Sequence, residues 1–120
     1  MAAEDKLRSV TLNDGNSIPS VGFGVYKISP AETEQAVRTA FAAGYRHVDT
    51  AALYGNEREV GRAVAASGLP RDEVYVVTKV WNSDQGYDST LRAFDTSMDR
   101  LGLEFLDLYL IHWPLPAAGK

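Results

Sequence analysis

The stretch VYVVTKV, residues 74–80, decides the fold of this 120-residue chain. Apart from Lys79 it consists of β-branched and aromatic residues, which favour a strand. Its nearly continuous apolar character is typical of a parallel strand that is covered on both faces. Comparable runs lie at residues 21–26, 46–50 and 106–112. The four runs start at residues 21, 46, 74 and 106, and these starts are 25, 28 and 32 residues apart, a spacing that predicts successive βα units in a parallel sheet.

Segments with helical periodicity fill the gaps between these runs. The first begins at residues 29–32, SPAE, which we interpret as a capping box with proline at the first helical position. The second covers about residues 56–66, and the third opens near Asp88 or Ser89 and ends at Gly102. Each segment has an apolar stripe that predicts a core-facing side. The stripes contain Ala36, Val37, Ala40 and Phe41 in the first helix, Val60, Ala63 and Val64 in the second, and Leu91, Phe94, Met98 and Leu101 in the third.

A hairpin is predicted ahead of the first βα unit. Residues 13–16, NDGN, separate two short runs around Val10 and Ile18, and Asp-Gly in such a setting indicates a hairpin turn. The hairpin could plug one end of a sheet. The order is then hairpin followed by β-α-β-α-β-α-β, within one domain over residues 1–120. Two architectures fit this order: an open doubly wound sheet, or the first half of a barrel whose full form needs about 250 residues.

Composition narrows the class of protein. Hydrophobic residues make up 45% of the chain and charged residues 23%, as in ordinary globular domains. The net charge of −4, without a basic cluster, argues against nucleic-acid binding. The absence of cysteine excludes disulfides, and two histidines far apart make a metal site a poor prediction. No apolar run approaches the roughly 18 residues of a membrane span, and the first residues lack a signal-peptide core, so we expect a soluble cytoplasmic protein.

Polar residues end three of the apolar runs. Asp49, Lys79 and His112 lie at their carboxyl ends, and Tyr54 follows Asp49 by five residues. Taken singly, each has an ordinary explanation: a turn cap, a lysine extending to solvent, a satisfied core histidine, a packed aromatic. Parallel strands, however, bring their carboxyl ends to one rim of the sheet, where α/β folds build their sites. Together the four residues therefore predict a titratable cluster.

The chemistry of such a cluster is coherent. A tyrosine has a reference pKa of about 10, too high for efficient proton transfer near neutral pH. A neighbouring lysine cation favours the phenolate, and Asp49 can hold Lys79 in place. Tyr54 is then a general acid for a carbonyl oxygen, to which His112 can donate a hydrogen bond. None of these groups is a source of electrons, so a hydride must come from a cofactor.

The motifs around these residues resemble those of the aldo-keto reductases. The resemblance rests on residues 44–51 (GYRHVDTA) with Tyr54 and residues 56–57, on residues 77–81 (VTKVW) and 108–114 (LYLIHWP), and on residues 22–26 and 12–16. Within that family the chain is most similar to the bacterial diketogluconate-reductase-like branch. The resemblance implies an α/β fold that is the N-terminal half of a (β/α)₈ TIM barrel with an N-terminal β-hairpin, truncated after the fourth strand.

The resemblance also implies an activity: NADPH-dependent reduction of aldehyde or ketone carbonyls on a small-molecule substrate. Tyr54 is then the proton donor, tuned by Lys79 and Asp49, and His112 orients the carbonyl. The implied cofactor-binding residues are Gly24, Val25, Tyr26 and Asp49. The implied substrate-binding residues are Tyr26, Trp81, His112 and Trp113, although the aromatic ones could simply pack in a core.

Two other functions remain open from the sequence. A lyase that uses Lys79 as a Schiff base would have little use for Tyr54 and Asp49. A truncated half-barrel could instead be non-catalytic and self-associate or act as an interaction module. The family's second half supplies strands five to eight and the loops that hold the adenosine 2′-phosphate, and it lies outside the 120 residues. We therefore expect the isolated chain to be impaired as a reductase.

Overall fold

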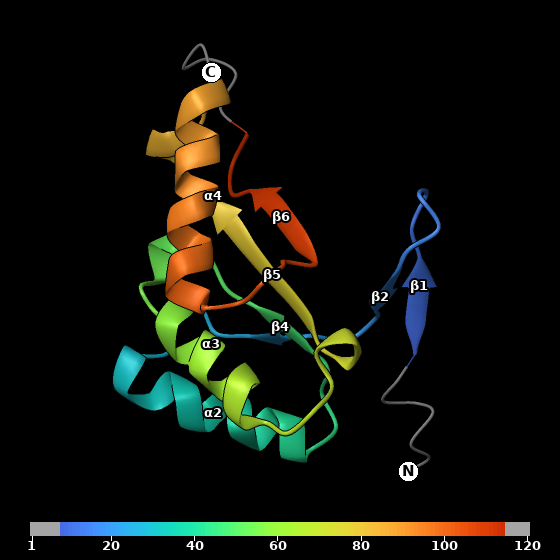
Figure 1. Ribbon diagram of the computed structural model, residues 1–120. Coiled ribbons are helices and arrows are strands. Elements are labelled where there is room, and N and C mark those ends of the chain that lie inside the picture. Colours follow the sequence, from blue (N-terminus) through green and yellow to red (C-terminus); the bar gives the residue numbers. More distant parts are fainter. Residues whose placement is uncertain (1–7, 115–120) are drawn as a thin grey trace.

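The computed structural model describes residues 8–114, which form a small hairpin and a four-stranded parallel sheet with helices (Figure 1). The hairpin pairs β1 (Ser9–Thr11) with β2 (Ser17–Pro19). The sheet has the order β3-β4-β5-β6. Its strands are β3 (Phe23–Gly24), β4 (His47–Asp49), β5 (Tyr75–Val80) and β6 (Leu108–Ile111). The four predicted strands are thus confirmed, and each is shorter than its apolar run.

The connections between the strands decide between the two architectures. α2 (Pro30–Ala42), α3 (Glu57–Ala66) and α4 (Tyr87–Leu101) each link one strand to the next and all lie on the same side of the sheet (Figure 1). A doubly wound sheet reverses its strand order and carries helices on both faces. Here the strand order equals the chain order without reversal. The described residues therefore have the arrangement of consecutive units of a (β/α)₈ barrel.

The core lies between the sheet and the three helices. Side chains alternate along a strand, and in β5 the residues Val76, Thr78 and Val80 are buried on the helix side. Val48 of β4 and Val25 join Val76 in the main apolar cluster. The helices contribute Val37, Phe41, Val60, Ala63, Val64 and Leu101 to this cluster. The opposite face of β5, with Tyr75 and Lys79, corresponds to the inside of a barrel.

Two details of the predicted helices are wrong. Ser29 does not cap the backbone of α2. Its hydroxyl donates to Glu32 Oε1 at 2.9 Å, so the two side chains of the expected capping box satisfy each other. α4 begins at Tyr87, ahead of Asp88, and Leu91 is 54% exposed rather than in the core. Within residues 8–114, α4 packs against α3 and β5, and these contacts leave Leu91 exposed.

The hairpin lies at the amino-terminal end of the sheet. Val10 pairs with Ile18, and Gly15 takes the positive φ of 88° that the tight turn requires. Nδ1 of His47, the first residue of β4, lies 3.2 Å from the carbonyl oxygen of Pro19. A cavity of about 750 Å³ separates the hairpin from residues that precede or begin β4, β5 and β6. The predicted position at one end of the sheet is thus observed, opposite to the end where the polar cluster lies.

The close crossing of α3 and α4 depends on Gly61. A Cβ built at this glycine would lie 1.9 Å from the carbonyl oxygen of Leu101, far inside contact distance. We expect Gly61→Ala to lower the free energy of unfolding by about 1–3 kcal/mol or more, as overpacking does. Urea denaturation of the 120-residue chain would measure the loss. Ala65→Ser, at an exposed position of the same helix, should change stability by less than about 0.5 kcal/mol and serves as the control.

No helix among residues 8–114 combines the length and apolar character that crossing a bilayer requires. In the same part of the chain, no group of three or more histidine and acidic side chains is placed to hold a metal ion.

Candidate active site

The carboxyl ends of the strands bring the predicted polar residues to one rim. Asp49 is the last residue of β4 and pairs in register with Val77, two positions before Lys79 in β5. Lys79 pairs in turn with Leu110, two positions before His112. On the other side, Gly24 of β3 pairs with Asp49. The parallel register therefore places residues from four strand ends side by side.

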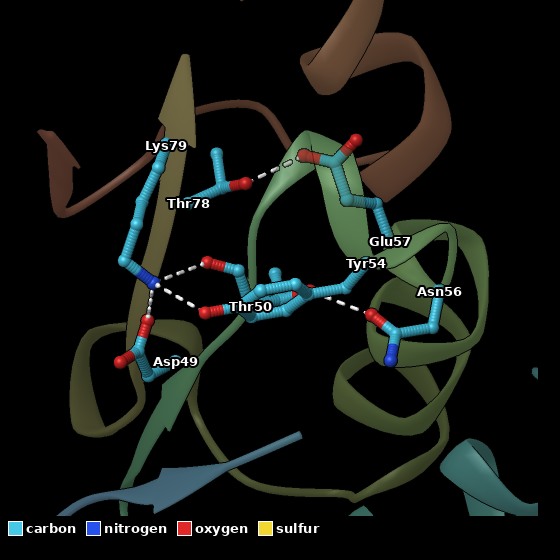
Figure 2. Close-up of polar contacts among 7 residues, drawn as sticks. All are labelled: Asp49, Thr50, Tyr54, Asn56, Glu57, Thr78 and Lys79. Carbon is cyan, nitrogen blue, oxygen red and sulfur yellow. Dashed lines mark hydrogen bonds and ion pairs between the residues drawn. The ribbon is translucent and has the colours of Figure 1, made fainter. Parts of the chain in front are cut away.

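The ammonium group of Lys79 is the centre of the cluster (Figure 2). It forms an ion pair with Asp49 and donates to the carbonyl oxygen of Thr50 at 3.0 Å. It also lies 3.4 Å from the hydroxyl oxygen of Tyr54. The Lys79 side chain is only 12% exposed, whereas that of Asp49 is 42% exposed. Since a buried charge without partners is costly, the oxygens around Nζ explain why the lysine is tolerated on this face.

Tyr54 reaches the lysine from a short turn after β4. The 3₁₀ helix η1 (Ala52–Tyr54) ends at Gly55, whose φ of 73° turns the chain back into α3. This geometry places the Tyr54 ring 5.1 Å from Nζ of Lys79, measured to the ring centroid. The ring also packs against Tyr26 and meets His112 edge-on, with centroid distances of 5.1 and 5.7 Å. Tyr54 therefore lies between the residues predicted to bind cofactor and to orient the substrate.

The surroundings of His112 favour its neutral form. Burial lowers its pKa below the usual value of 6.5, the Lys79 cation lowers it further, and Asp49 opposes the shift. Its Nδ1 is buried and has no hydrogen-bond partner among the described residues. A neutral ring carries one N–H and can donate a hydrogen bond without bringing a second cation to the rim.

The pKa of His112 offers a direct check of these charges. We expect Lys79→Met to raise it, because the variant removes a cation that disfavours the imidazolium, and Asp49→Asn to lower it. NMR titration of the ring protons in the 120-residue chain would measure both shifts. The folded chain binds this proton less readily than the unfolded chain, so acidification below about pH 6.5 should favour unfolding. If the parent chain and both variants gave the same His112 titration curve, the proposed effect of Lys79 and Asp49 on this pKa would be contradicted.

Aromatic side chains form one wall of the rim. The Trp81 ring lies 5.2 Å from His112 and 5.9 Å from Trp113, between centroids. Gln85 Nε2 donates to the carbonyl oxygen of Trp113 at 2.6 Å, which fixes the segment after β6. Tyr26 and Trp113 are 60% and 57% exposed, so in the described residues these two rings are not core side chains.

The residues predicted to approach the cofactor differ in accessibility. Gly24 is exposed, and no heavy atom lies within 4 Å of the place where its Cβ would be. The Val25 side chain is fully buried in the core cluster, and its N–H donates to the carbonyl oxygen of Asp49 at 3.2 Å. The Val25 side chain is therefore not on the rim, whereas the backbone at Gly24 and the exposed ring of Tyr26 face the open side.

Asn56 and Glu57, for which the sequence predicts no role in the site, are buried beside the cluster. Figure 2 shows that Asn56 binds Thr50 and that Glu57 binds Thr78. Asn56 also donates to two backbone carbonyl groups. A glutamate in the first turn of a helix usually lies in solvent near the helix dipole. The residue type of Glu57 therefore did not indicate that it would be buried. The sequence feature that could have identified Asn56 and Glu57 is their position immediately after the Tyr54-Gly55 turn.

Comparison with known proteins places this chain in a family. The family model described as "Aldo/keto reductase family" matches residues 20–118. An aldo-keto reductase of Mycobacterium sp. (strain KMS) is 68% identical over 107 residues, which are 89% of this chain and 39% of that protein. The crystal structure of an aldo/keto reductase from Brucella melitensis, 57% identical, superposes with a TM-score of 0.89 over 92% of this chain and 42% of the other.

Two further solved structures are similar. The Bombyx mori aldo-keto reductase in complex with NADP is 43% identical, with a TM-score of 0.85 over 90% of this chain and 38% of that one. A putative 2,5-diketo-D-gluconic acid reductase B is 39% identical, with a TM-score of 0.84 over 94% and 40% of the two chains. The chain belongs to the aldo/keto reductase family, and it spans about two-fifths of the length of these relatives.

Proposed function

We propose that this chain carries the proton-transfer half of an NADPH-dependent oxidoreductase that reduces aldehyde or ketone carbonyls to alcohols. One observation carries the proposal above all: Nζ of Lys79, paired with Asp49, lies 3.4 Å from the hydroxyl oxygen of Tyr54. A phenol next to a fixed cation can give its proton to a carbonyl oxygen, because the cation stabilises the phenolate that remains.

Each residue of the cluster then has a separate role. Tyr54 donates the proton to the substrate oxygen, and Lys79 stabilises the negative charge that this leaves on the ring. Asp49 holds Lys79 in position through the ion pair. His112, kept neutral by burial, donates a hydrogen bond to the same substrate oxygen. Trp81, Trp113 and Tyr26 form aromatic walls beside the proposed position of the reacting carbonyl.

The residues fit a nicotinamide cofactor. The open space at Gly24 and the exposed ring of Tyr26 lie beside Asp49, so a flat ring has room next to the cluster. NADPH would supply the hydride that none of these side chains can provide. Gly24, the backbone at Val25, Tyr26 and Asp49 are the residues proposed to contact it. The NADP complex of the Bombyx mori relative supports this choice of cofactor.

A Schiff-base lyase is the less suitable alternative. Its lysine must present a free amine to a carbonyl carbon, whereas Nζ of Lys79 is engaged by Asp49, Thr50 and Tyr54. Those contacts serve a fixed cation better than a nucleophile.

The proposal is tested in a full-length chimera in which this chain replaces the matching 39% of the Mycobacterium sp. (strain KMS) relative. We expect the chimera to oxidise NADPH when an aldehyde is added, as followed by the absorbance of the reduced nicotinamide. Lys79→Met should lower this rate by roughly 10²-fold or more, since it removes the charge stabilisation of the phenolate. A chimera that binds NADPH but reduces no aldehyde or ketone would contradict the proposed function.

A second candidate function is non-catalytic self-association of the 120-residue chain. The observation that favours it is the pair of sheet edges: within the described residues, β3 pairs only with β4, and β6 pairs only with β5. Leu110 and Ile111 of the β6 edge are exposed. Unpaired strand edges are ready templates for another chain.

A further inference from the structure

We propose that Asn56 and Glu57 form a buried clamp that fixes Tyr54 against Lys79, so that both are positioning residues for proton transfer. The inference rests on the proposed function of Tyr54. Neither side chain touches the substrate rim itself. They are the first and second residues after Gly55, and each binds a residue adjacent in sequence to a member of the cluster (Figure 2).

Asn56 secures one side of the turn. Its side chain is fully buried, and its Nδ2 donates to the carbonyl oxygens of Val25 at 3.1 Å and Ile28 at 3.3 Å. Its Oδ1 accepts a hydrogen bond from the Thr50 hydroxyl at 2.7 Å. The same Thr50 offers its carbonyl oxygen to Nζ of Lys79. One amide thus connects the segment that carries Tyr26 with a residue that binds the lysine.

Glu57 secures the other side. Its side chain is 1% exposed, and Oε2 accepts a hydrogen bond from the Thr78 hydroxyl at 2.6 Å. Oε1 accepts from Arg100 Nη1 at 3.2 Å, which joins α3 to α4. Thr78 precedes Lys79 on β5 and faces the helices, whereas Lys79 faces the rim. The carboxylate therefore fixes the strand at the residue next to the catalytic lysine.

The clamp affects the position of Tyr54 as well as the stability of the fold. Tyr54 lies on a turn of three residues and a glycine, which by itself would leave the ring free to shift. The lysine comes from a different strand, so the 3.4 Å separation depends on how the turn is attached to β5. A displacement of about 1 Å in a reacting group can cost roughly 10²-fold in rate. A buried charge without its partners would be costly, so the Glu57 bonds hold the turn in one arrangement.

Kinetics of the chimera separate positioning from stability. We expect Glu57→Gln and Asn56→Ala to lower kcat by roughly tenfold to a hundredfold. Asn56→Ala should also raise KM for NADPH, because it releases the segment of Val25 and Tyr26, whereas Glu57→Gln should leave that KM within about twofold. Val64→Ala is the matched control: it weakens the core face of α3 without contacting the clamp, and its kcat should stay near that of the parent.

The outcomes distinguish the clamp from the proposed function. If Tyr54→Phe is inactive but both clamp variants keep the kcat of Val64→Ala, the clamp is wrong and the proton donor stands. If Tyr54→Phe itself stays active, the proposed role of Tyr54 as proton donor is contradicted, and with it the proposed function. A second measurement needs no catalysis: in the 120-residue chain, the NOE between the Tyr54 and His112 rings, 5.7 Å apart between centroids, should weaken in both clamp variants and persist in Val64→Ala. Persistence in all variants would overturn the clamp.

Discussion

Replacing Tyr54 with phenylalanine in the full-length chimera should remove most of the carbonyl reduction, by roughly 10²–10⁴-fold in kcat. The substitution deletes the hydroxyl that lies 3.4 Å from Nζ of Lys79 and keeps the ring, so the packing against Tyr26 and His112 remains. Affinity for NADPH should therefore change little. Steady-state kinetics with an aldehyde, together with a fluorescence titration of NADPH, measure the two effects separately.

The control for this variant is Tyr87→Phe, which removes the hydroxyl of an exposed tyrosine at the start of α4. It should have the kcat of the parent. Activity of Tyr54→Phe within a few-fold of the parent would show that another group protonates the substrate.

The 120-residue chain alone should be a poor or inactive reductase and should self-associate. In the described residues, β3 and β6 each have one neighbouring strand, and the face with Tyr75 and Lys79 has no opposing strands. Unpaired N–H and C=O groups on an edge invite pairing with another chain, and exposed apolar surface adds to this tendency. Two copies that pair edge to edge could close an eight-stranded barrel. NADPH binding should be weak, because the chain spans only about two-fifths of its relatives.

Light scattering gives the mass of the chain, and fluorescence quenching gives its affinity for NADPH. A useful comparison is Ile111→Lys, which places a charge on the exposed β6 edge, a common means of preventing strand pairing. This variant should shift the population toward monomer. A compact monomeric parent that binds NADPH tightly and reduces an aldehyde would show that the predicted self-association is wrong.

Much of the fold could be predicted because its strands are apolar runs that recur at regular intervals along the sequence. The run at residues 74–80 contains β5, and the spacing of the runs predicts four parallel strands joined by helices, whereas only the structure decides their order in the sheet. The ends of the strands were predicted less accurately, because a strand extends only where its backbone pairs with a neighbouring strand. The apolar run at residues 21–26, for example, pairs with β4 only at Phe23 and Gly24. Leu91 shows the same limitation. Helical periodicity identifies an apolar stripe, but only the neighbouring elements decide which part of it is covered.

The rim of the site could be predicted for a different reason. A lysine or aspartate on a buried strand conflicts with its surroundings, and Asp49 and Lys79 show this conflict in the sequence alone. Asn56 and Glu57 show no such conflict, because both residue types are common at the start of a helix. Their burial arises only when the turn after β4 packs against β5. Such a role depends on contacts between distant segments, and the position of the two residues after the Tyr54-Gly55 turn is the local signal for it.

The alternation of side chains along β5 has a consequence for how this chain tolerates change. Thr78 bonds to Glu57 on the helix side, and the next residue, Lys79, meets Asp49 on the other. Inserting or deleting one residue before Thr78 would exchange the two faces, turning the ammonium toward Glu57 and the apolar core and a hydroxyl toward the rim. Substitutions on one face of the strand can occur independently of those on the other, but the register of β5 cannot shift by one residue. Natural length variation should therefore be confined to the loops, and β5 should keep its residue count wherever the chemistry is kept.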